Sequence, residues 1–329
     1  MSSPAVRCAI GIDLGGTNLK GGVIDDAGRV RLKHSQPAPA KDSSPEHIVA
    51  ALVNLAHDLR QQAAALGLEP EGVGIGVPNF IEGPDWIQRQ VNNLPGLNDF
   101  PIRPSLVAAL GERIALDNDV MNAGLAEYYY GEGQRYERVF FMAIGTGIAA
   151  SIFIEGGQRL RYILGWPGDT GHIIVDPLGA RCTCGGRGCL ETVAAGPAIR
   201  EQALRLAASG LSPDLATRLQ AAGDLEARDV TEAALAGDAA ARQIWDQVGW
   251  YLGVALTTYQ HIFDPHVILV GGGVAQAGEL LLEPARRTMA ELGSPYYLKH
   301  LQALRQAALG ADAGLIGAAG LILLPPSVL

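Results

Sequence analysis

The sequence has no long hydrophobic run and no run of basic residues. Its longest apolar stretch, residues 139–154, is interrupted by Gly145, Thr146 and Gly147 and is too short to cross a bilayer. The first residues lack the charged and apolar regions of a secretory signal, so we expect a soluble, cytoplasmic protein with no membrane partner. The net charge of −9 is spread along the chain without Lys/Arg patches, which argues against a nucleic-acid partner.

Two common nucleotide-binding motifs are also missing. The chain has no G-x4-G-K-[ST] phosphate loop. Residues 271–273 are glycines that follow an expected strand, but the G-x-G-x-x-G pattern of dinucleotide sites fails there at its third glycine. Glycine itself is abundant, with 42 among 329 residues, and it gathers at the ends of expected strands. Such glycines let a backbone approach a ligand closely.

Cysteine is scarce apart from one cluster. Cys182, Cys184 and Cys189 form C-x-C-x4-C, and His172 lies ten residues before the first of them. Three thiolates and one imidazole are the ligand set of a closed tetrahedral zinc site. The alternatives are buried cysteines that act as small apolar residues, or a disulfide pair. The odd number in the cluster, with Cys8 far away, and the expected reducing compartment favour structural Zn²⁺.

The order of the expected elements indicates a duplicated α/β unit. The first copy has strands over residues 6–12, 20–24 and 30–34, a helix from residue 44 and a buried strand over 72–77. The second copy has strands over residues 139–144 and 148–154, a helix over 239–263 and a strand over 266–270. A glycine loop follows the first strand of each copy, Gly15-Gly16-Thr17 and Gly145-Thr146-Gly147. We therefore predict two α/β lobes with a ligand cleft between them, and loops that present backbone N–H groups to phosphate oxygens.

Three polar residues, Asp117, Asn118 and Asp119, lie where a strand over residues 113–116 meets a helix that runs to Tyr130. A helix N-cap explains one of them. Open α/β sheets bind ligands beyond the carboxyl ends of their strands, and a carboxylate there can take the proton of a hydroxyl that is being phosphorylated. We favour catalysis for this segment, and capping is compatible with it.

Together these motifs resemble the ROK family of repressors, open reading frames and sugar kinases, within the wider group of actin-like (ribonuclease H-like) ATPases. The resemblance spans nearly the whole chain in the right order. It rests on the loop 13–17, Asn118-Asp119, the loop 145–147, Gly171-His172, the cysteine run through Glu191, and the glycines 271–273. It implies a glucokinase-like enzyme that uses ATP and Mg²⁺ to phosphorylate a hexose at its 6-hydroxyl.

The resemblance also assigns roles to individual residues. Asp119 matches the catalytic base. The sugar-binding positions are Asn93, Asn118, Asp119, Asp169, His172 and Glu191. The positions that bind the ATP phosphates and Mg²⁺ are Asp13, Gly15, Gly16, Thr17, Lys20, Gly145 and Thr146, and those near adenosine are Gly271, Gly272 and Gly273. His172, Cys182, Cys184 and Cys189 would bind the structural Zn²⁺.

One departure from the family concerns the sugar. The family usually has Gly-Glu-x-Gly-His, whereas this chain has Asp169 in place of the Glu, one methylene shorter. We therefore expect glucose to compete with mannose, N-acetylmannosamine, N-acetylglucosamine or fructose. A non-catalytic sugar-binding regulator and a zinc-stapled scaffold without a ligand are further alternatives. With five residues before Val6 we expect no DNA-binding segment ahead of the first strand, and the base and both glycine loops are kept.

The expected lobes divide the chain unequally. We expect a smaller lobe of residues 1–117 and 311–329, and a larger lobe of residues 118–310 that carries the zinc loop and an inserted helical region. The partners we expect are a hexose, ATP and further copies of the chain in a dimer or tetramer.

Overall fold

The computed structural model describes residues 6–78, 80–83, 86–89, 91, 94–111, 113–160 and 170–326. Two compact units divide the chain. The first consists of Met1–Arg135, Ser151–Pro167 and Ala308–Leu329, and the second of Tyr136–Ala150 and Gly168–Ala307. The expected lobe boundaries, and the cleft between the lobes, stay predictions.

The first unit contains a five-stranded sheet in the order β3-β2-β1-β4-β7. Its strands are β1 (Cys8–Leu14), β2 (Asn18–Asp25), β3 (Val30–Pro37), β4 (Val73–Val77) and β7 (Ile114–Asn118). The β1–β2 and β2–β3 pairs are antiparallel, whereas β4 pairs in parallel with β1 and with β7. The carboxyl ends of β1, β4 and β7 therefore lie at the same edge of this sheet. Open α/β sheets bind their ligands at such an edge.

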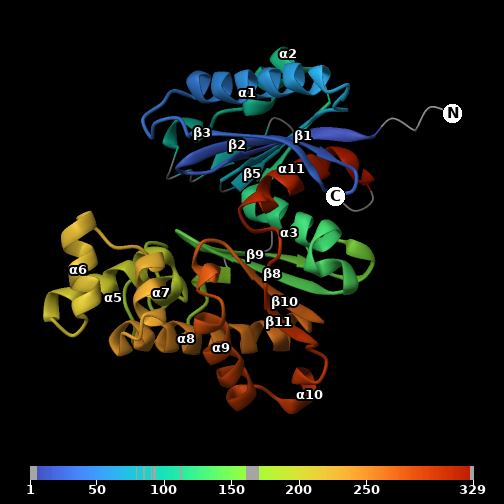
Figure 1. The fold of residues 1–329 in the computed structure, drawn as a ribbon. Coiled ribbons are helices and arrows are strands. Elements are labelled where there is room, and N and C mark those ends of the chain that lie inside the picture. Colours follow the sequence, from blue (N-terminus) through green and yellow to red (C-terminus); the bar gives the residue numbers. More distant parts are fainter. Residues whose placement is uncertain are drawn as a thin grey trace. The chain divides into compact units, whose positions relative to one another are not determined.

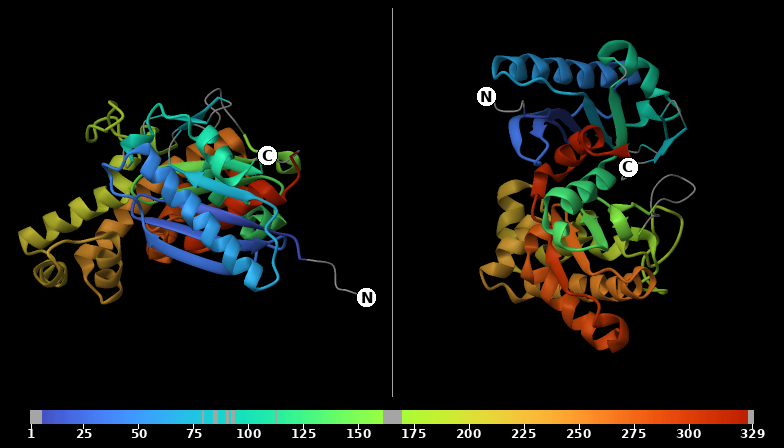
Figure 2. Two further views of the ribbon diagram at one scale, coloured as in Figure 1. Left: turned by 90° about the horizontal axis from the view of Figure 1, so that it is seen from above. Right: turned by 90° about the vertical axis from the view of Figure 1, so that its right-hand side faces the viewer.

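Helices cover both faces of this sheet (Figures 1 and 2). On one face lie α1 (Pro45–Ala65) and α2 (Ile102–Leu110), and on the other α3 (Asp119–Tyr130) and α11 (Ala313–Leu323). Helix α1 begins at Ser44, whose Oγ accepts the backbone N–H of His47, and Pro45 occupies its first position.

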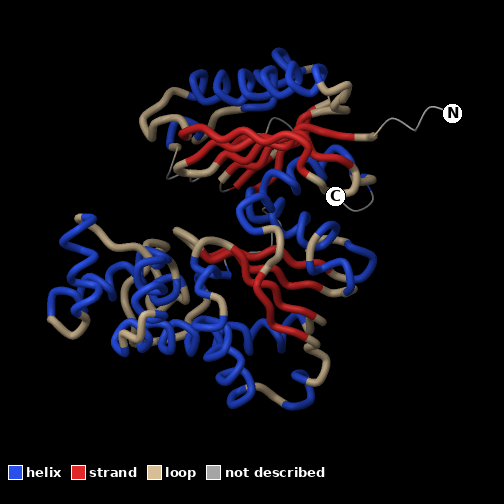
Figure 3. Tube along the Cα trace, in the orientation of Figure 1, coloured by secondary structure: helices blue, strands red, loops and turns tan. Residues whose placement is uncertain are grey.

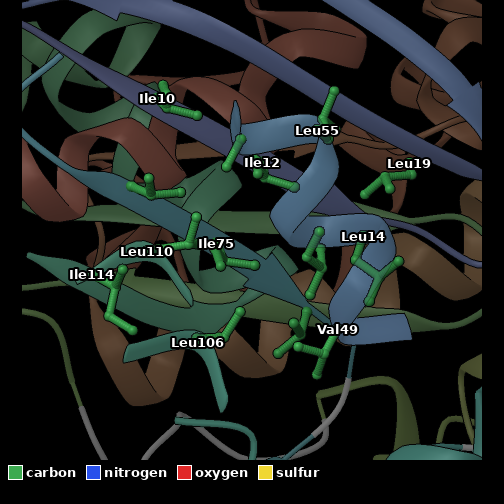
Figure 4. Close-up of a cluster of buried hydrophobic side chains, with 14 of the residues drawn as sticks. Ile10, Ile12, Leu14, Leu19, Val49, Leu55, Ile75, Leu106, Leu110 and Ile114 are labelled. Carbon is green, nitrogen blue, oxygen red and sulfur yellow. The ribbon is translucent and has the colours of Figure 1, made fainter. Parts of the chain in front are cut away.

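Buried aliphatic side chains fill the space under α1 and α2. Ile12 and Ile75 from the sheet pack with Leu55 of α1 and Leu106 of α2 (Figure 4). On the opposite face, α11 packs directly against the backbone of the strands. A Cβ on Gly74 would lie 1.7 Å from the backbone oxygen of Ala318, so only glycine allows this approach.

A second sheet has four strands in the order β11-β10-β8-β9 (Figure 3), and all of its residues belong to the second unit except the end of β9 from Ser151 onward, which belongs to the first. Its strands are β8 (Val139–Ile144), β9 (Ile148–Phe153), β10 (Val267–Gly271) and β11 (Ala303–Gln306). Strand β10 pairs in parallel with β8 and with β11. The helices of the second unit are α4 (Glu191–Ala194), α5 (Gly196–Ser209), α6 (Pro213–Ala222), α7 (Ala227–Leu235), α8 (Ala239–Phe263), α9 (Glu279–Leu292) and α10 (Pro295–Leu298).

The predicted α/β class with two sheets is confirmed, and each sheet contains a strand, a glycine loop and a second strand in sequence. Strands β5 (Phe80–Glu82) and β6 (Ile87–Arg89) pair with each other in a separate two-stranded sheet. In the part of the chain that the structure describes, no helix has the length and hydrophobicity needed to cross a membrane.

Candidate active site and metal centre

Two of the predicted acidic residues lie close together in the first unit. Asp13 is near the carboxyl end of β1, and Asp119 is the first residue of α3, directly after β7. Strand β4 runs between these strands, and Gly76 pairs with Asp13 on one side and with Asp117 on the other. A Cβ on Gly76 would lie 3.6 Å from Asp13 Oδ1 and from Asp119 Cα. The absence of a side chain at Gly76 thus lets both acidic residues approach the same place.

The junction between β7 and α3 is held by its own polar side chains. Asn118 is the N-cap, and its Oδ1 accepts the backbone N–H of Val120 at 2.9 Å and of Met121 at 3.1 Å. The expectation that capping explains one of the three polar residues therefore holds for Asn118. The predicted contact of Asn118 with a sugar stays a prediction.

Asp117 takes part in an ion pair that the sequence did not reveal. Its Oδ2 lies 2.8 Å from Nη1 of Arg159, and the side chains are 13% and 1% exposed. The other oxygen of Asp117 accepts the backbone N–H of Asn118 at 2.8 Å. Because breaking a buried ion pair leaves an uncompensated charge, this contact fixes the position of the strand end that precedes Asp119.

The environment of Asp119 favours its protonated form. Burial, and to a smaller extent the nearby carboxylate of Asp13, raise the pKa of Asp119 to about 7. Burial also raises the pKa of Asp13, while Lys20, its cross-strand neighbour on β2, opposes that rise. A carboxyl group with a pKa near neutrality is well matched to accept a proton from a hydroxyl at physiological pH.

The predicted phosphate loop of the first unit is a tight, exposed turn between β1 and β2. Gly15 donates its N–H to the backbone oxygen of Asn18 at 3.0 Å, and Gly16 and Thr17 are exposed. Lys20 donates from Nζ to the backbone oxygen of Ala311 at 3.1 Å. Lys20 thus sits beside Asp13 and is tied to the segment that leads into α11.

The second glycine loop joins β8 to β9 in the second unit. Gly145 donates to the backbone oxygen of Gly147 at 2.9 Å and accepts the N–H of Gly196 at 2.8 Å, while Thr146 is exposed. At the end of β10, Gly272 has a φ of 86°, and a Cβ on it would lie 2.3 Å from the backbone oxygen of Ile144. Gly271, Gly272 and Gly273 therefore pass directly beside the end of β8, at the carboxyl edge of this sheet.

The four predicted metal ligands converge in the second unit. The ligand atoms of His172, Cys182, Cys184 and Cys189 all lie within 4.8 Å of one another. Cys182 Sγ is 3.5 Å from His172 Nδ1, and Cys184 Sγ is 3.7 Å from Cys189 Sγ. Tetrahedral zinc with bonds of about 2.3 Å to sulfur and about 2.0 Å to nitrogen places its ligand atoms about 3.5–3.8 Å apart. The cluster could therefore hold a metal ion, and the two short distances match those between ligands of tetrahedral zinc.

The segment that carries this cluster is anchored on the start of β9 at both ends. At one end, a Cβ on Gly171 would lie 2.5 Å from the backbone oxygen of Ile148. At the other end, Glu191 Oε2 accepts the N–H of the same Ile148 at 3.0 Å. The Tyr259 hydroxyl of α8 donates to the backbone oxygen of Thr170. The segment with the four predicted metal ligands, and Glu191 after it, thus packs directly against the strand that follows the second glycine loop.

Two predicted sugar-binding residues, Asn93 and Asp169, lie outside the described residues. Their roles stay predictions, as do the roles of the other predicted site residues.

Two sheets that each carry a glycine loop after the first strand are the arrangement of the actin-like ATPase fold, which the chain shares with solved sugar-kinase structures. The sequence profile of the ROK family matches residues 9–324, and the chain belongs to that family. A protein named Glucokinase from Thermotoga maritima is 31% identical over 318 residues, which cover 95% of this chain and 96% of the relative.

Two solved structures give the same fold. One is a ROK family glucokinase from Streptomyces griseus in complex with glucose and AMPPNP, 30% identical, with a TM-score of 0.81 over 95% of this chain and 98% of that chain. The other is a ROK family transcriptional regulator, a homolog of the E. coli MLC protein, 28% identical, with a TM-score of 0.83 over 96% of this chain and 78% of that chain. The family therefore includes both enzymes and regulators of similar fold.

Proposed function

We propose that this chain transfers the terminal phosphoryl group of ATP to the 6-hydroxyl of a hexose, with glucose as the first candidate. The observation that carries the proposal is Asp119, a carboxyl group with a pKa of about 7 at the carboxyl end of β7, beside Asp13. The glucokinases from Thermotoga maritima and Streptomyces griseus support the choice of reaction.

In the proposed reaction, Asp119 accepts the proton of the 6-hydroxyl as its oxygen attacks the phosphorus atom of ATP. The glycine loops 15–17 and 145–147 donate backbone N–H groups to the phosphate oxygens. Asp13 would hold the water shell of Mg²⁺, and the ion would supply positive charge to neutralise those phosphates. Asn118, His172 and Glu191 bind the ring hydroxyls. The glycines 271–273 lie along the adenosine.

We also propose that the His172–Cys189 cluster binds structural zinc. Because His172 Nδ1 faces Cys182 Sγ, the metal would bind Nδ1 and fix the proton on Nε2. Nε2–H is then a donor of fixed direction for a sugar oxygen. In this proposal the zinc sets the orientation of one sugar contact and takes no part in the phosphoryl transfer.

Two alternatives share the same residues. A kinase for N-acetylmannosamine, N-acetylglucosamine or fructose would use the same base, and Asp169 in place of the usual Glu favours this wider range. A non-catalytic sugar-binding regulator is favoured by the likeness to the MLC homolog. The retained Asp119 argues for the kinase. Association into a dimer or tetramer, and a cytoplasmic location, stay predictions.

The test is to incubate the purified protein with ATP, Mg²⁺ and a panel of hexoses and N-acetylhexosamines, and to follow ADP release. Asp119→Asn serves as the matched control for contaminating kinases. We expect sugar-dependent ADP release by the wild type alone. If no sugar in the panel gives more ADP than the control variant, the kinase proposal is wrong.

A further inference from the structure

Asn122 on α3 is a buried polar side chain that forms no hydrogen bond with the residues that the structure describes. The residue is fully buried, and neither its Oδ1 nor its Nδ2 has a hydrogen-bond partner among the described residues. A buried amide without partners lowers the stability of a fold. Such a residue calls for an explanation, because an apolar side chain of the same size would stabilise the helix packing.

A second buried polar side chain of α3, nearer its carboxyl end, shows that the fold can satisfy such groups. Glu127 is also fully buried, but its carboxylate accepts the backbone N–H groups of Leu309 at 2.6 Å and Glu132 at 3.2 Å. Asn122 therefore differs from Glu127, because no polar contact among the described residues explains its polarity.

The amide of Asn122 lies near the Asp13 carboxylate and the backbone of Asp119. A Cβ on Gly76 would be 2.9 Å from Asn122 Nδ2 and 3.6 Å from Asp13 Oδ1 and Asp119 Cα. The amide, the Asp13 carboxylate and the backbone of Asp119 thus surround the side of β4 that Gly76 leaves without a side chain. All of these groups belong to the first unit.

The backbone of Asn122 is held by a close contact between two helices. Helix α11 packs so closely on α3 that a Cβ on Gly317 would lie 1.7 Å from the backbone oxygen of Asn122. This contact fixes the backbone from which the amide reaches Gly76 of β4. An amide both donates and accepts hydrogen bonds, and buried waters typically bridge polar groups that lack protein partners.

We propose that Asn122 is a positioning residue, whose amide holds the carboxylates of Asp13 and Asp119 in their working arrangement through one ordered water molecule. This inference rests on the proposed phosphoryl transfer, in which Asp119 is the base. The amide is neutral, so it orients both carboxylates without forming an ion pair with either. Asn122 itself touches neither sugar nor phosphate in this role.

The variant Asn122→Leu tests the proposal, because leucine has a similar size and no polar group. We expect the melting temperature to rise by about 2 °C or more, since an unpaired buried amide is removed. We expect kcat to fall by about 10- to 100-fold with KM for the sugar changed less than about threefold, because a small displacement of reacting groups is that costly. Asn122→Ser, which keeps a polar group, should recover part of kcat. Leu125→Met, a buried and volume-conserving change on the same helix, should leave kcat unchanged.

Two outcomes would overturn the inference. If Asn122→Leu raises the melting temperature and keeps kcat within twofold, the amide has no positioning role. If it lowers the melting temperature, and Asn122→Ser does the same without recovering kcat, the residue serves packing alone.

Wild-type turnover decides the proposed function separately. Should the wild type phosphorylate no hexose, a crystal structure decides the inference. A water molecule within about 3.2 Å of both the Asn122 amide and one of the two carboxylates supports it, and no such water refutes it.

Discussion

Asp119 is the residue whose substitution tests the proposed chemistry most directly. Asp119→Asn keeps the size and the hydrogen-bonding capacity of the side chain but cannot accept a proton. We expect turnover to fall by about 10²–10⁴-fold while sugar binding is kept, because that is the usual contribution of a general base. ADP release measures the turnover, and calorimetry measures the sugar binding. Wild-type turnover in the variant would mean that another group takes the proton.

The raised pKa of Asp119 predicts how the reaction depends on pH. The base must be ionised, and burial raises its pKa to about 7. We therefore expect kcat/KM for the sugar to be constant above that pH and to fall about tenfold per unit below it. A profile that stays flat down to about pH 5 would show that Asp119 is ionised over this whole range and that burial does not raise its pKa to about 7.

The same pKa shift also affects folding. An aspartate carboxyl group ordinarily has a pKa of 3.8, whereas the pKa of Asp119 in the folded chain is about 7, so the folded chain binds more protons than the unfolded chain in between. The contribution of Asp119 to the free energy of unfolding is therefore most favourable below the lower value and declines as pH rises to about 7. Asp119→Asn should stabilise the protein more at pH 8 than at pH 4 in urea unfolding. Asp58→Asn on the exposed face of α1 controls for the loss of one charge, and an equal effect of Asp119→Asn at both pH values would contradict the linkage.

At the scale of a structural element, the zinc loop gives the clearest expectation. Cys184→Ser removes an exposed ligand while keeping a small polar side chain. We expect zinc content to fall from about one per chain to well below that value, and the melting temperature to fall as well, because metal binding is coupled to folding of the loop. Elemental analysis and thermal unfolding measure the two effects. Cys8→Ala, in strand β1, should leave the zinc content at about one per chain, and zinc-free wild-type protein would refute the site.

Helix α3 depends on Glu127 at its carboxyl end. The carboxylate accepts N–H groups from Leu309 and Glu132, which precede α11 and follow α3. Glu127→Gln replaces one acceptor oxygen by an NH₂ group that faces a donor, so we expect a loss of about 1–3 kcal/mol in the free energy of unfolding. Glu201→Gln on α5, in an exposed pair with Arg205, should cost at most about 0.5 kcal/mol. Equal effects of the two substitutions would show that burial of Glu127 does not matter.

At the scale of the whole molecule, the sequence predicted those features that depend on a few neighbouring residues. Strand ends marked by glycine, the helix start at Ser44-Pro45 and the spacing of the cysteines are short-range patterns, and the structure contains each of them. Contacts between distant segments were not predictable. Glu127 and Leu309 are 182 residues apart, and the approach of Asn122 to Asp13 depends on the pairing of β1 with β4 and on Gly76 between them. No local pattern records which buried polar groups find partners, because packing of the whole unit decides this.

Binding of the proposed sugar should stabilise the folded chain against heat. A ligand that binds only the folded state raises the free energy of unfolding by RT ln(1 + [L]/Kd), about 2.7 kcal/mol at 100 times Kd. Glucose, or the preferred hexose from the panel, should therefore raise the melting temperature of the wild type. Asp119→Asn should keep this rise, because the base contributes little to binding the sugar in its ground state. Cys184→Ser should lose most of it, because His172 and Glu191 are carried by the metal-binding segment that Ile148 anchors. If Cys184→Ser keeps the full rise while its zinc is gone, the sugar is held without the zinc loop and the assigned roles of His172 and Glu191 are wrong.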